Sequence, residues 1–568
     1  MIVKKLAIVL LSFSLLTSCT KKLDELLVNP NGPTPEKADV DLYLPVIQNN
    51  FISVFNSASL FGMQLTRMII MYGPTYNQAY SPQDFDGVWT AAYTGVLKHA
   101  NELIPIATAQ KKYTQASMAK VMKAYTMMTL VDMFGDVPYA EANLGFGNTN
   151  PTVTKGSDVY AAAIKLLQEA SDTLDLVARG RISHGAFPGF LDNFYGTTGA
   201  VGARRWSTQA KLFQLRAYMT TRLVDNTAKA KIEALLANAD VIASFTGTAQ
   251  DFEFKFSNKQ ANPNSRHPRY NGNYTANGSA GDYLGTQMLF SLAAENGLFN
   301  NDPSRDNSDP RTRYYFYRQQ TDYLQANSQT VSCAGTTPPA HYTAGMPFCL
   351  INVAGFWGRD HGDNSGIPPD GNLRTTWGIY PAGGDMDLGQ GSRVSLNRGG
   401  LGAGIHPMWQ SSFTDFLRAE AVLTLGIAGD AKALLKSAVE KSISKVLGYP
   451  ATIGYAVPAA FVPSAAKVTA HVNKVLANYD AATTNSDRLK VIMKEWYLAS
   501  WGNGYDAHNN YRRTGSPSNL QFARLPESGG YIRSFLYPST FINLNNNAGE
   551  QQSITKKVFW DTNPSNLK

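Results

Sequence analysis

The chain has 568 residues, of which 51 are Lys or Arg and 43 are Asp or Glu, so its formal net charge is +8. Only 17% of the residues are charged, and the basic ones are scattered, with no basic run longer than a pair such as Lys111-Lys112 or Arg204-Arg205. This distribution excludes a nucleic-acid-binding protein, which needs a clustered basic stripe.

The N-terminal segment is typical of a bacterial export signal. Two lysines precede an apolar run over residues 6–16, which is too short for a stable membrane-spanning helix. The run ends in Leu-Thr-Ser before Cys19, and this pattern resembles a lipobox, whose cysteine is lipidated and becomes the first residue of the mature protein. We therefore predict a signal peptide over residues 1–18, a lipid anchor on Cys19 and a tether over residues 19–40. The alternative is a cleaved soluble export signal with an incidental cysteine.

Residues 41–245 are predicted to be mainly helical. Apolar and aromatic side chains recur there at helical spacings of three or four residues, in two stripes made of Phe85, Trp89, Tyr93 and Val96 and of Met118, Val121, Met122, Tyr125, Met128 and Val131. Such stripes indicate core faces rather than cofactor sites. Ser207 is predicted to cap the N-terminus of a helix that bears Phe213.

Residues 246–408 are predicted to form a loop-rich insert, because Gly, Pro, Asn and Tyr dominate and no helical period lasts. A structureless loop of this length is unusual in a compact domain unless it is functional. We expect it to pack around its own aromatic side chains and to contain a few short strands. Over residues 409–568 we expect helix pairs joined by short turns and then a loop-rich tail, so that the whole forms one domain.

Besides Cys19, the chain contains only Cys333 and Cys349. In an oxidising compartment, two thiols this close together in a loop-rich stretch are expected to form a disulfide. On the chain-entropy account, closing such a loop stabilises a fold by about 3 kcal/mol. The alternative is a pair of buried free thiols.

Several segments together resemble one family. VMKAYTMMTLVDMFGDVPYAEA (121–142) is similar to the helix and FGDVPY signature of SusD/RagB proteins, which are outer-membrane lipoproteins of Bacteroidetes. RRWSTQAKLFQLRAYMTTRL (204–223), DFLRAEAVLTLG (415–426) and WGNGYDAHNNYRRTGSP (501–517) resemble further family segments, and residues 309–311 resemble its Asp-Pro-Arg element. The resemblance covers nearly the whole chain, in the family's order.

The resemblance implies a mainly α fold, in which tetratricopeptide-like helix pairs form a superhelical scaffold for a large loop-rich ligand-binding insert. It implies a lipid-anchored protein of the outer membrane, exposed at the cell surface. It also implies that the protein captures an oligosaccharide or an oligopeptide and delivers it to a SusC-like TonB-dependent transporter. It does not imply catalysis, and no cofactor is expected.

The most conspicuous motifs have structural interpretations. Gly135 of the FGDVPY segment is expected to end the preceding helix in a left-handed conformation, and Pro138 to prevent its continuation. Arg512 and Arg513 are expected to hold the C-terminal loops through bonds to carboxylates or carbonyls. A solvated turn is favoured for the acidic stretch made of Asp302, Asp306, Asn307 and Asp309, although its oxygen atoms could coordinate calcium.

Two neighbourhoods are rich in the aromatic, Arg, Asn and Asp side chains that suit sugar rings and their hydroxyl groups. The early one contains Tyr72, Tyr76, Asn77, Tyr80 and Trp89, although Trp89 lies on a helical stripe and is expected to be buried. The second, in the insert, contains Tyr314, Tyr315, Tyr317, Trp357, Arg359, Trp377 and Tyr380. From these we select as ligand-binding candidates Trp357, Arg359, Tyr76, Asn77, Tyr80, Tyr314, Tyr315 and Trp377.

Two other functions remain open from the sequence. A surface-anchored glycoside hydrolase needs only two carboxylates that the fold brings together, and sequence cannot exclude such a pair. A purely structural surface protein would neither bind nor cleave a glycan. No nucleophile, phosphate-binding or metalloprotease motif is present, and the eight histidines are dispersed without metal-ligand spacing, so we predict a binding protein rather than an enzyme.

Overall fold

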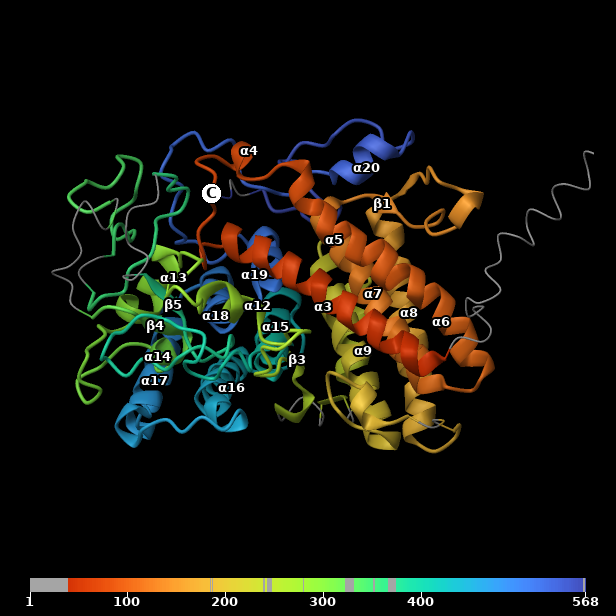
Figure 1. Ribbon diagram of the computed structural model, residues 1–568, viewed down its shortest axis with the longest axis horizontal. Helices are drawn as coiled ribbons and strands as arrows, with labels where there is room; N and C mark the ends of the chain where they lie inside the picture. Colours follow the sequence, from red (N-terminus) through yellow and green to blue (C-terminus); the bar gives the residue numbers. More distant parts are fainter. Residues whose placement is uncertain are drawn as a thin grey trace, which may run out of the picture.

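The computed structural model describes residues 39–183, 185, 187–238, 241–242, 248–278, 280–321, 331, 333–350, 353–365, 374–564 and 567. The predicted signal peptide, Cys19 and nearly all of the predicted tether lie outside these residues. The described chain is mainly helical, as predicted, and Figure 1 shows the helices in two groups that the long helix α3 (Val40–Leu65) connects.

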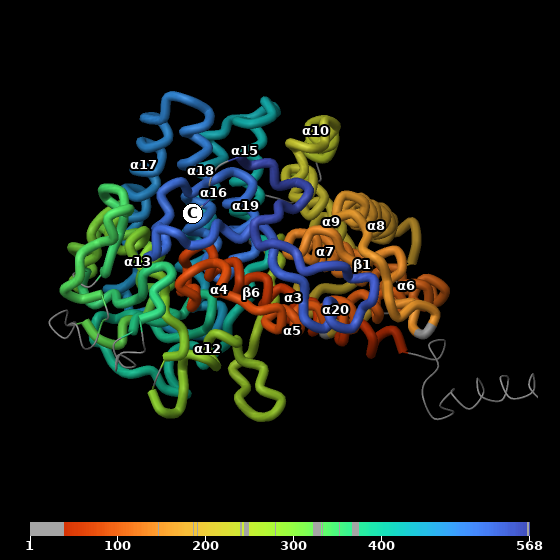
Figure 2. The backbone as a smooth tube through the Cα atoms, turned by 90° about the horizontal axis from the view of Figure 1, so that it is seen from above, coloured from red at the N-terminus to blue at the C-terminus, as the bar shows by residue number. Residues whose placement is uncertain are grey.

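The first group contains the helices that follow α3. They are α5 (Asp86–Thr90), a π-helical turn (Ala91–Leu97), α6 (Lys98–Ala109), α7 (Tyr113–Phe134), α8 (Gly156–Ala178), α9 (Gly199–Thr221) and α10 (Ala228–Leu236). The two predicted aromatic and methionine stripes are buried here, as is Trp89. Helices α7, α8 and α9 lie side by side (Figure 2) and alternate in direction, as in tetratricopeptide-like pairs.

The second group contains the C-terminal helix pairs. They are α15 (Ser411–Leu425) with α16 (Ala431–Thr452), α17 (Ala465–Ala481) with α18 (Asn485–Ala499), and then α19 (Gly504–Thr514). The last helix, α20 (Ser539–Leu544), returns to the first group (Figure 1), where the Ser539 hydroxyl donates to Asp86 of α5. The predicted short turn between α15 and α16 is confirmed. Gly426 ends α15 in the left-handed region at φ 62°, and the Asp430 carboxylate caps α16 by accepting bonds from the backbone N–H groups of Lys432 and Ala433.

The insert between these groups contains only short elements. They are β3 (Phe252–Lys255), α12 (Pro268–Asn273), α13 (Thr286–Phe290), α14 (Thr312–Tyr315), β4 (Phe316–Arg318), β5 (Thr375–Trp377) and β6 (Ile405–Trp409). Strand β3 pairs antiparallel with β6, so that Phe252 faces Trp409, and β4 pairs antiparallel with β5, so that Phe316 faces Trp377. A third antiparallel pair joins β1 (Val137–Pro138) to β2 (Val153–Thr154).

The proposed partition at residues 245/246 and 408/409 stays a prediction. One hydrophobic cluster nevertheless contains side chains from all three parts, such as Phe51, Trp377 and Trp496. Helix α3 of the N-terminal helical part and helix α19 of the C-terminal part cross with their backbones almost in contact. A Cβ atom added to Gly62 would lie only 2.0 Å from the Gly504 carbonyl oxygen, so this crossing requires glycine at both positions.

One local prediction is confirmed and one is wrong. Gly135 ends α7, as predicted, with a positive φ of 79°, although its ψ of −116° differs from the left-handed helical conformation that was expected. The Asp136 carboxylate accepts a 2.8 Å bond from the Gly156 N–H at the start of α8. Ser207 was expected to be an N-cap, but α9 begins eight residues earlier, at Gly199. Its hydroxyl instead donates a 2.5 Å bond to Asp175 on α8, so the residue joins two helices.

The buried carboxylate of Asp132, on α7, connects distant segments. It accepts bonds from the Tyr160 hydroxyl, from the Tyr505 hydroxyl at 2.5 Å, from the Asn509 amide at 2.8 Å and from the Trp560 indole N–H at 2.8 Å. These four donors belong to α8, α19 and the C-terminal tail. Burying a carboxylate costs free energy unless it is fully hydrogen-bonded, so this group requires all of its partners in place.

Arg512 and Arg513 have the structural role that was expected. Arg512 donates to the backbone carbonyl of Asp132 at 2.7 Å and lies over the Trp560 ring, and both guanidinium groups are buried. Arg513 makes a bidentate contact with the Glu420 carboxylate on α15. Within the described part of the chain, no helix is both long and apolar enough to span a membrane.

Replacing Asp132 should destabilise the whole fold. In Asp132→Ala, four buried donors lose their acceptor, and we expect the free energy of unfolding to fall by about 3 kcal/mol or more. Urea denaturation followed by circular dichroism measures this change. The control is Asp172→Ala on exposed α8 surface, where we expect a change within about 0.5 kcal/mol. Equal stability of the two variants would contradict the role given to Asp132.

Candidate functional site

Three segments that are far apart in the sequence meet at one loop face, which we call the loop junction: residues 66–80 after α3, residues 280–286 with 357–365 of the insert, and residues 520–531 of the tail. Main-chain hydrogen bonds join them. Gly285 N–H donates to the Met68 carbonyl at 2.9 Å and Arg359 N–H donates to the Leu284 carbonyl at 2.9 Å. Tyr76 N–H donates to the Ser528 carbonyl at 2.7 Å.

A buried polar network lies beneath this face. Arg67 has positive φ (61°) and donates from Nε to the Gln521 carbonyl at 2.9 Å and from Nη2 to the Tyr76 hydroxyl at 3.0 Å. The Tyr76 hydroxyl is also 3.0 Å from His361 Nε2. Burial raises the pKa of Tyr76 to about 12, and burial followed by the Arg67 charge holds the pKa of His361 well below its usual range. These groups therefore fix the backbone and do not titrate near neutral pH.

The disulfide predicted between Cys333 and Cys349 is present, with Cα atoms 5.5 Å apart. Its loop is attached to the same network. The Gln521 amide donates to Asp360 at 2.6 Å and to the Pro347 carbonyl at 2.7 Å, while the Tyr342 hydroxyl donates to the Phe522 carbonyl at 2.9 Å. The disulfide loop thus supports the tail segment of the loop junction.

The surface of the loop junction carries an exposed aromatic ring, Tyr72, which is 55% exposed. Among the described residues, it is the only aromatic member of the exposed large hydrophobic side chains. Partial burial and then the neighbouring Asp282 carboxylate raise the pKa of the Tyr72 hydroxyl, while Arg374, Arg359 and Arg269 oppose this shift. The tyrosine therefore lies within electrostatic reach of one carboxylate and three guanidinium groups.

The groups around Tyr72 are held rigidly. The guanidinium carbons of Arg359 and Arg374 lie 4.2 and 3.8 Å from the centre of the Tyr283 ring. Asp282 accepts a 2.9 Å bond from the Trp377 indole N–H and lies 3.3 Å from Arg269. Arg359 and Arg374 are themselves buried and donate to the carbonyls of Ser365 and Ala280. They hold a rigid polar base under an exposed ring, and the face of such a ring can stack on the apolar face of a sugar.

The eight candidates from the sequence lie in different surroundings. Six are buried, Tyr80 is half-buried and only Asn77 is exposed; the buried six are Trp357, Arg359, Tyr76, Tyr314, Tyr315 and Trp377. Trp377, for example, stacks on Trp501 at 4.2 Å between ring centres. The ligand-binding role of all eight stays a prediction. Five of the eight belong to the loop junction, namely Trp357, Arg359, Tyr76, Asn77 and Tyr80, whereas Tyr314 and Tyr315 pack in the core.

Sequence reasoning named Tyr72 within the early neighbourhood but did not select it, and it missed Asp282, Tyr283 and Arg374. One signal was available: Asp282 and Tyr283 lie between Gly281 and Gly285 in the insert. Gly285 permits a very close backbone approach, because an added Cβ would lie 2.1 Å from the Arg67 carbonyl oxygen. A glycine in such a loop can mark a point where another chain segment passes.

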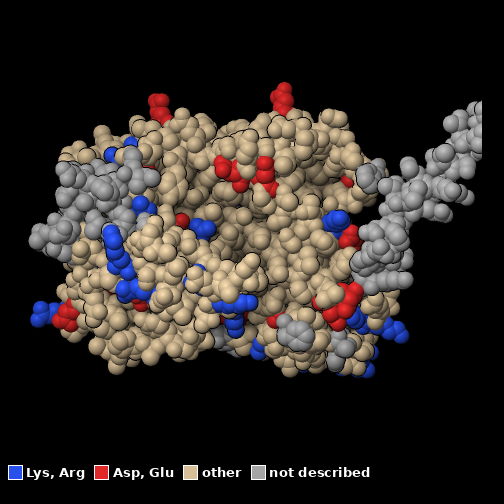
Figure 3. Space-filling model, viewed as in Figure 1, with Lys and Arg blue, Asp and Glu red and all other residues tan. Residues whose placement is uncertain are grey.

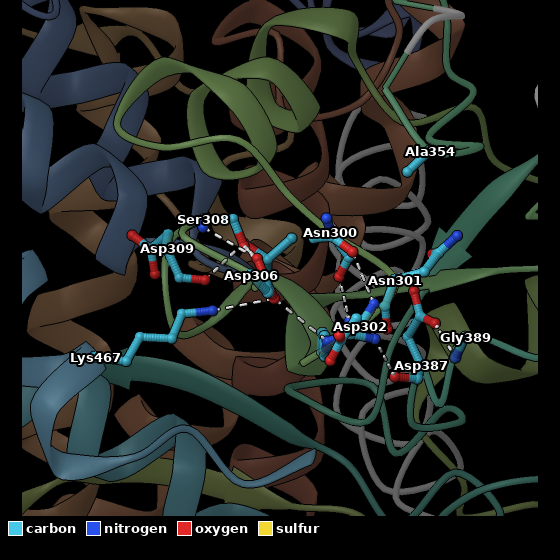
Figure 4. Close-up of polar contacts among 12 residues, drawn as sticks. Asn300, Asn301, Asp302, Asp306, Ser308, Asp309, Ala354, Asp387, Gly389 and Lys467 are labelled. Atoms are coloured by element: carbon cyan, nitrogen blue, oxygen red, sulfur yellow. Dashed lines mark hydrogen bonds and ion pairs between the residues drawn. The ribbon is translucent and has the colours of Figure 1, made fainter. Parts of the chain in front are cut away.

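The acidic stretch considered for calcium lines a separate groove of about 860 Å³ beside α17. Figure 4 shows that its carboxylates already face side-chain cations: Asp306 lies 3.0 Å from Lys467 and 3.4 Å from Arg313. Burial alone would raise the pKa of Asp309, but Arg311 and His471 outweigh it and hold that pKa well below its usual range. Across the described residues, no group of three or more His, Cys, Asp or Glu side chains could hold a metal ion.

The close approach at Gly285 gives a test of the loop junction. In Gly285→Ala, the new methyl group clashes with the Arg67 backbone, so we expect residues 66–72 and 283–286 to separate. Hydrogen–deuterium exchange should become at least about tenfold faster there, with little change in α7. Gly87→Ala is the control, because nothing lies within 4 Å of the added Cβ. Unchanged exchange in Gly285→Ala would contradict this geometry.

Two family models match the chain. One, described as starch-binding and associating with the outer membrane, matches residues 30–330, and the other, described as SusD and RagB outer membrane lipoprotein, matches residues 405–557. No curated protein matches the chain.

The chain is also similar to solved structures. A SusD/RagB family protein from Bacteroides thetaiotaomicron has 18% identity and a TM-score of 0.65, and a SusD homologue from Bacteroides fragilis has 16% identity and a TM-score of 0.61. A chitin-binding SusD homologue from Flavobacterium johnsoniae has 17% identity and a TM-score of 0.59. Each comparison covers 92% of this chain and 99% of the other, so the shared fold is complete. With this fold and the two family models in the same order along the sequence, the chain belongs to the SusD/RagB family.

Proposed function

We propose that the protein captures an oligosaccharide at the cell surface, as a lipoprotein anchored through Cys19, and delivers it to a SusC-like TonB-dependent transporter. The observation that carries the proposal is the exposed Tyr72 ring, with Asp282, Arg359 and Arg374 fixed beside it. The family description as outer membrane lipoproteins supports the anchor and the location. Short oligopeptides are the other ligand class that such a surface could take.

The choice of a glycan rests on chemistry and on relatives. A flat exposed ring among rigid polar groups provides stacking and hydrogen bonds without large rearrangement, which limits the entropy lost on binding. One family model is described as starch-binding, and a similar solved structure is described as chitin-binding. Starch and chitin oligosaccharides are therefore the first ligands to test.

The transporter partner is supported by the character of α3. This helix crosses the face seen in Figure 3, and from Leu42 to Leu65 it contains no charged residue. Its exposed positions include Val46, Asn49 and Ser53. Protein interfaces are depleted of charge at their centres, so we propose that this face of α3 contacts the transporter.

The substitution Tyr72→Ala tests the proposed binding site. We expect wild-type protein to bind maltohexaose or chitohexaose without cleaving it, and Tyr72→Ala to bind about tenfold more weakly because the stacking platform is lost. Isothermal titration calorimetry gives the affinity, and chromatography of the sugar gives any product. Tyr113→Ala, which removes a half-buried tyrosine at the start of α7, is the control and should bind like wild type. Wild-type affinity in Tyr72→Ala would refute the site, and cleavage of the sugar would instead indicate a glycoside hydrolase.

Recovery of the transporter tests the partnership. We expect full-length, C-terminally tagged protein to bring a large β-barrel protein with it from the detergent-solubilised outer membrane of its native host. Ser53→Arg places a charge on the face of α3 and should lower barrel recovery several-fold, as expected for a charge buried at an interface. Ser157→Arg, on exposed α8 surface, should leave it unchanged. Absence of a barrel with the wild-type protein would exclude the partnership.

A further inference from the structure

One end of the first helical group is defined by the alternating directions of α7, α8 and α9. Lys120 and Glu169 form a 2.7 Å ion pair between α7 and α8, and Lys211 and Asp175 form a 2.7 Å pair between α9 and α8. In antiparallel helices, these pairings place the start of α7, the end of α8 and the start of α9 at the same end of the group. The start of α3 joins them, because Lys112 lies 3.1 Å from Asp41.

Four exposed cations gather at this end. Lys111 lies two residues before α7, Arg179 and Arg181 follow α8, and Arg204 lies near the start of α9. None of the four forms an ion pair with the part of the chain that the structure describes. In Figure 3, Lys and Arg atoms appear beside Asp and Glu atoms at the lower right of the molecule, near the end from which α3 starts.

Large apolar side chains are exposed among these cations. Leu42, in the first turn of α3, is 71% exposed, Leu176 near the end of α8 is 46% exposed, and Val201 at the start of α9 is 59% exposed. Exposed apolar groups interleaved with Lys and Arg are typical of a surface that lies in the interface of a lipid bilayer. We call these seven residues the basic end: Leu42, Lys111, Leu176, Arg179, Arg181, Val201 and Arg204.

We propose that the basic end rests on the anionic, phosphate-bearing headgroups of the membrane. The described chain starts at Asp39 on this end, where Lys112 lies 3.8 Å from the Asp39 carboxylate. Cys19 is 20 residues upstream, and a chain of that length reaches at most about 70 Å. The proposal therefore rests on the proposed lipid anchor, whose tether joins the described chain at this end.

The arrangement gives the lipid anchor an orientation. Lipid chains alone fix the distance from the membrane but leave the protein free to rotate on its tether, whereas a basic patch adds a second, directional attachment. Helix α3 then runs from the basic end to the loop junction, and its 26 residues span about 39 Å. The loop junction is thereby held in one orientation relative to the bilayer.

Vesicle binding tests the proposal without the lipid anchor. The full mature chain carrying Cys19→Ser is incubated with vesicles of phosphatidylcholine alone or with 30% phosphatidylglycerol, and the bound fraction is measured by flotation. We expect binding to the anionic vesicles that weakens as salt rises. Reversing the four cations (Lys111→Glu, Arg179→Glu, Arg181→Glu and Arg204→Glu) should lower the partition coefficient at least about tenfold.

The matched control reverses four exposed cations that also form no ion pair with the described chain, at Lys98, Lys155, Lys259 and Lys556. It has the same net charge and should retain most of the binding. Equal loss in both variants, or binding that is independent of anionic lipid, would overturn the proposal. Melting curves and glycan titration of both variants show whether the fold and the ligand site are intact. Mass spectrometry of the wild-type protein shows separately whether Cys19 is lipidated, so failure of the anchor is distinguishable from failure of the basic end.

Discussion

The carboxylate of Asp132 has to be satisfied by four donors at once, and this requirement determines how the two helical groups fit together. Its partners come from α8, α19 and the C-terminal tail, so the group can be desolvated only after segments more than 400 residues apart have met. The close backbone contact between Gly62 and Gly504 adds a second constraint, because it allows α3 and α19 to cross in only one geometry. Together they fix where α3 ends, and the loop junction begins directly after that point.

The loop junction depends on main-chain bonds rather than on side-chain packing at its surface. Arg67, Tyr76, His361 and Gln521 form a buried layer that holds the backbone, while Tyr72 projects above it. Most of the described aromatic side chains of the insert are buried. Trp377 stacks in the core and gives its indole N–H to Asp282, so its influence on the ligand face is exerted through the position of that carboxylate.

Local features of the fold could be predicted from the sequence because their causes are local. The end of α7 at Gly135, the turn before Asp430 and the apolar stripe of α7 each depend on residues that lie close together in the sequence. The failure at Ser207 has the opposite cause, since its hydroxyl is used by Asp175 on another helix. The candidate site was only partly predictable, because a loop tyrosine at position 72 and a core tyrosine at position 315 look alike until the long-range contacts are known. The basic end was not predicted for the same reason. Its four cations are scattered in the sequence, and only the alternating helix directions bring together Lys111, Arg179, Arg181 and Arg204.

Because main-chain atoms join the three segments, the loop junction can tolerate side-chain substitutions during evolution. Carbonyl and N–H groups are the same whatever residue carries them, so the bonds between Met68 and Gly285 or between Leu284 and Arg359 survive when nearby side chains are exchanged. The residue at position 72 and its exposed neighbours on this face can therefore be substituted with little loss of folding stability. A few point substitutions can therefore change the surface chemistry of the loop junction, while its main-chain architecture is retained.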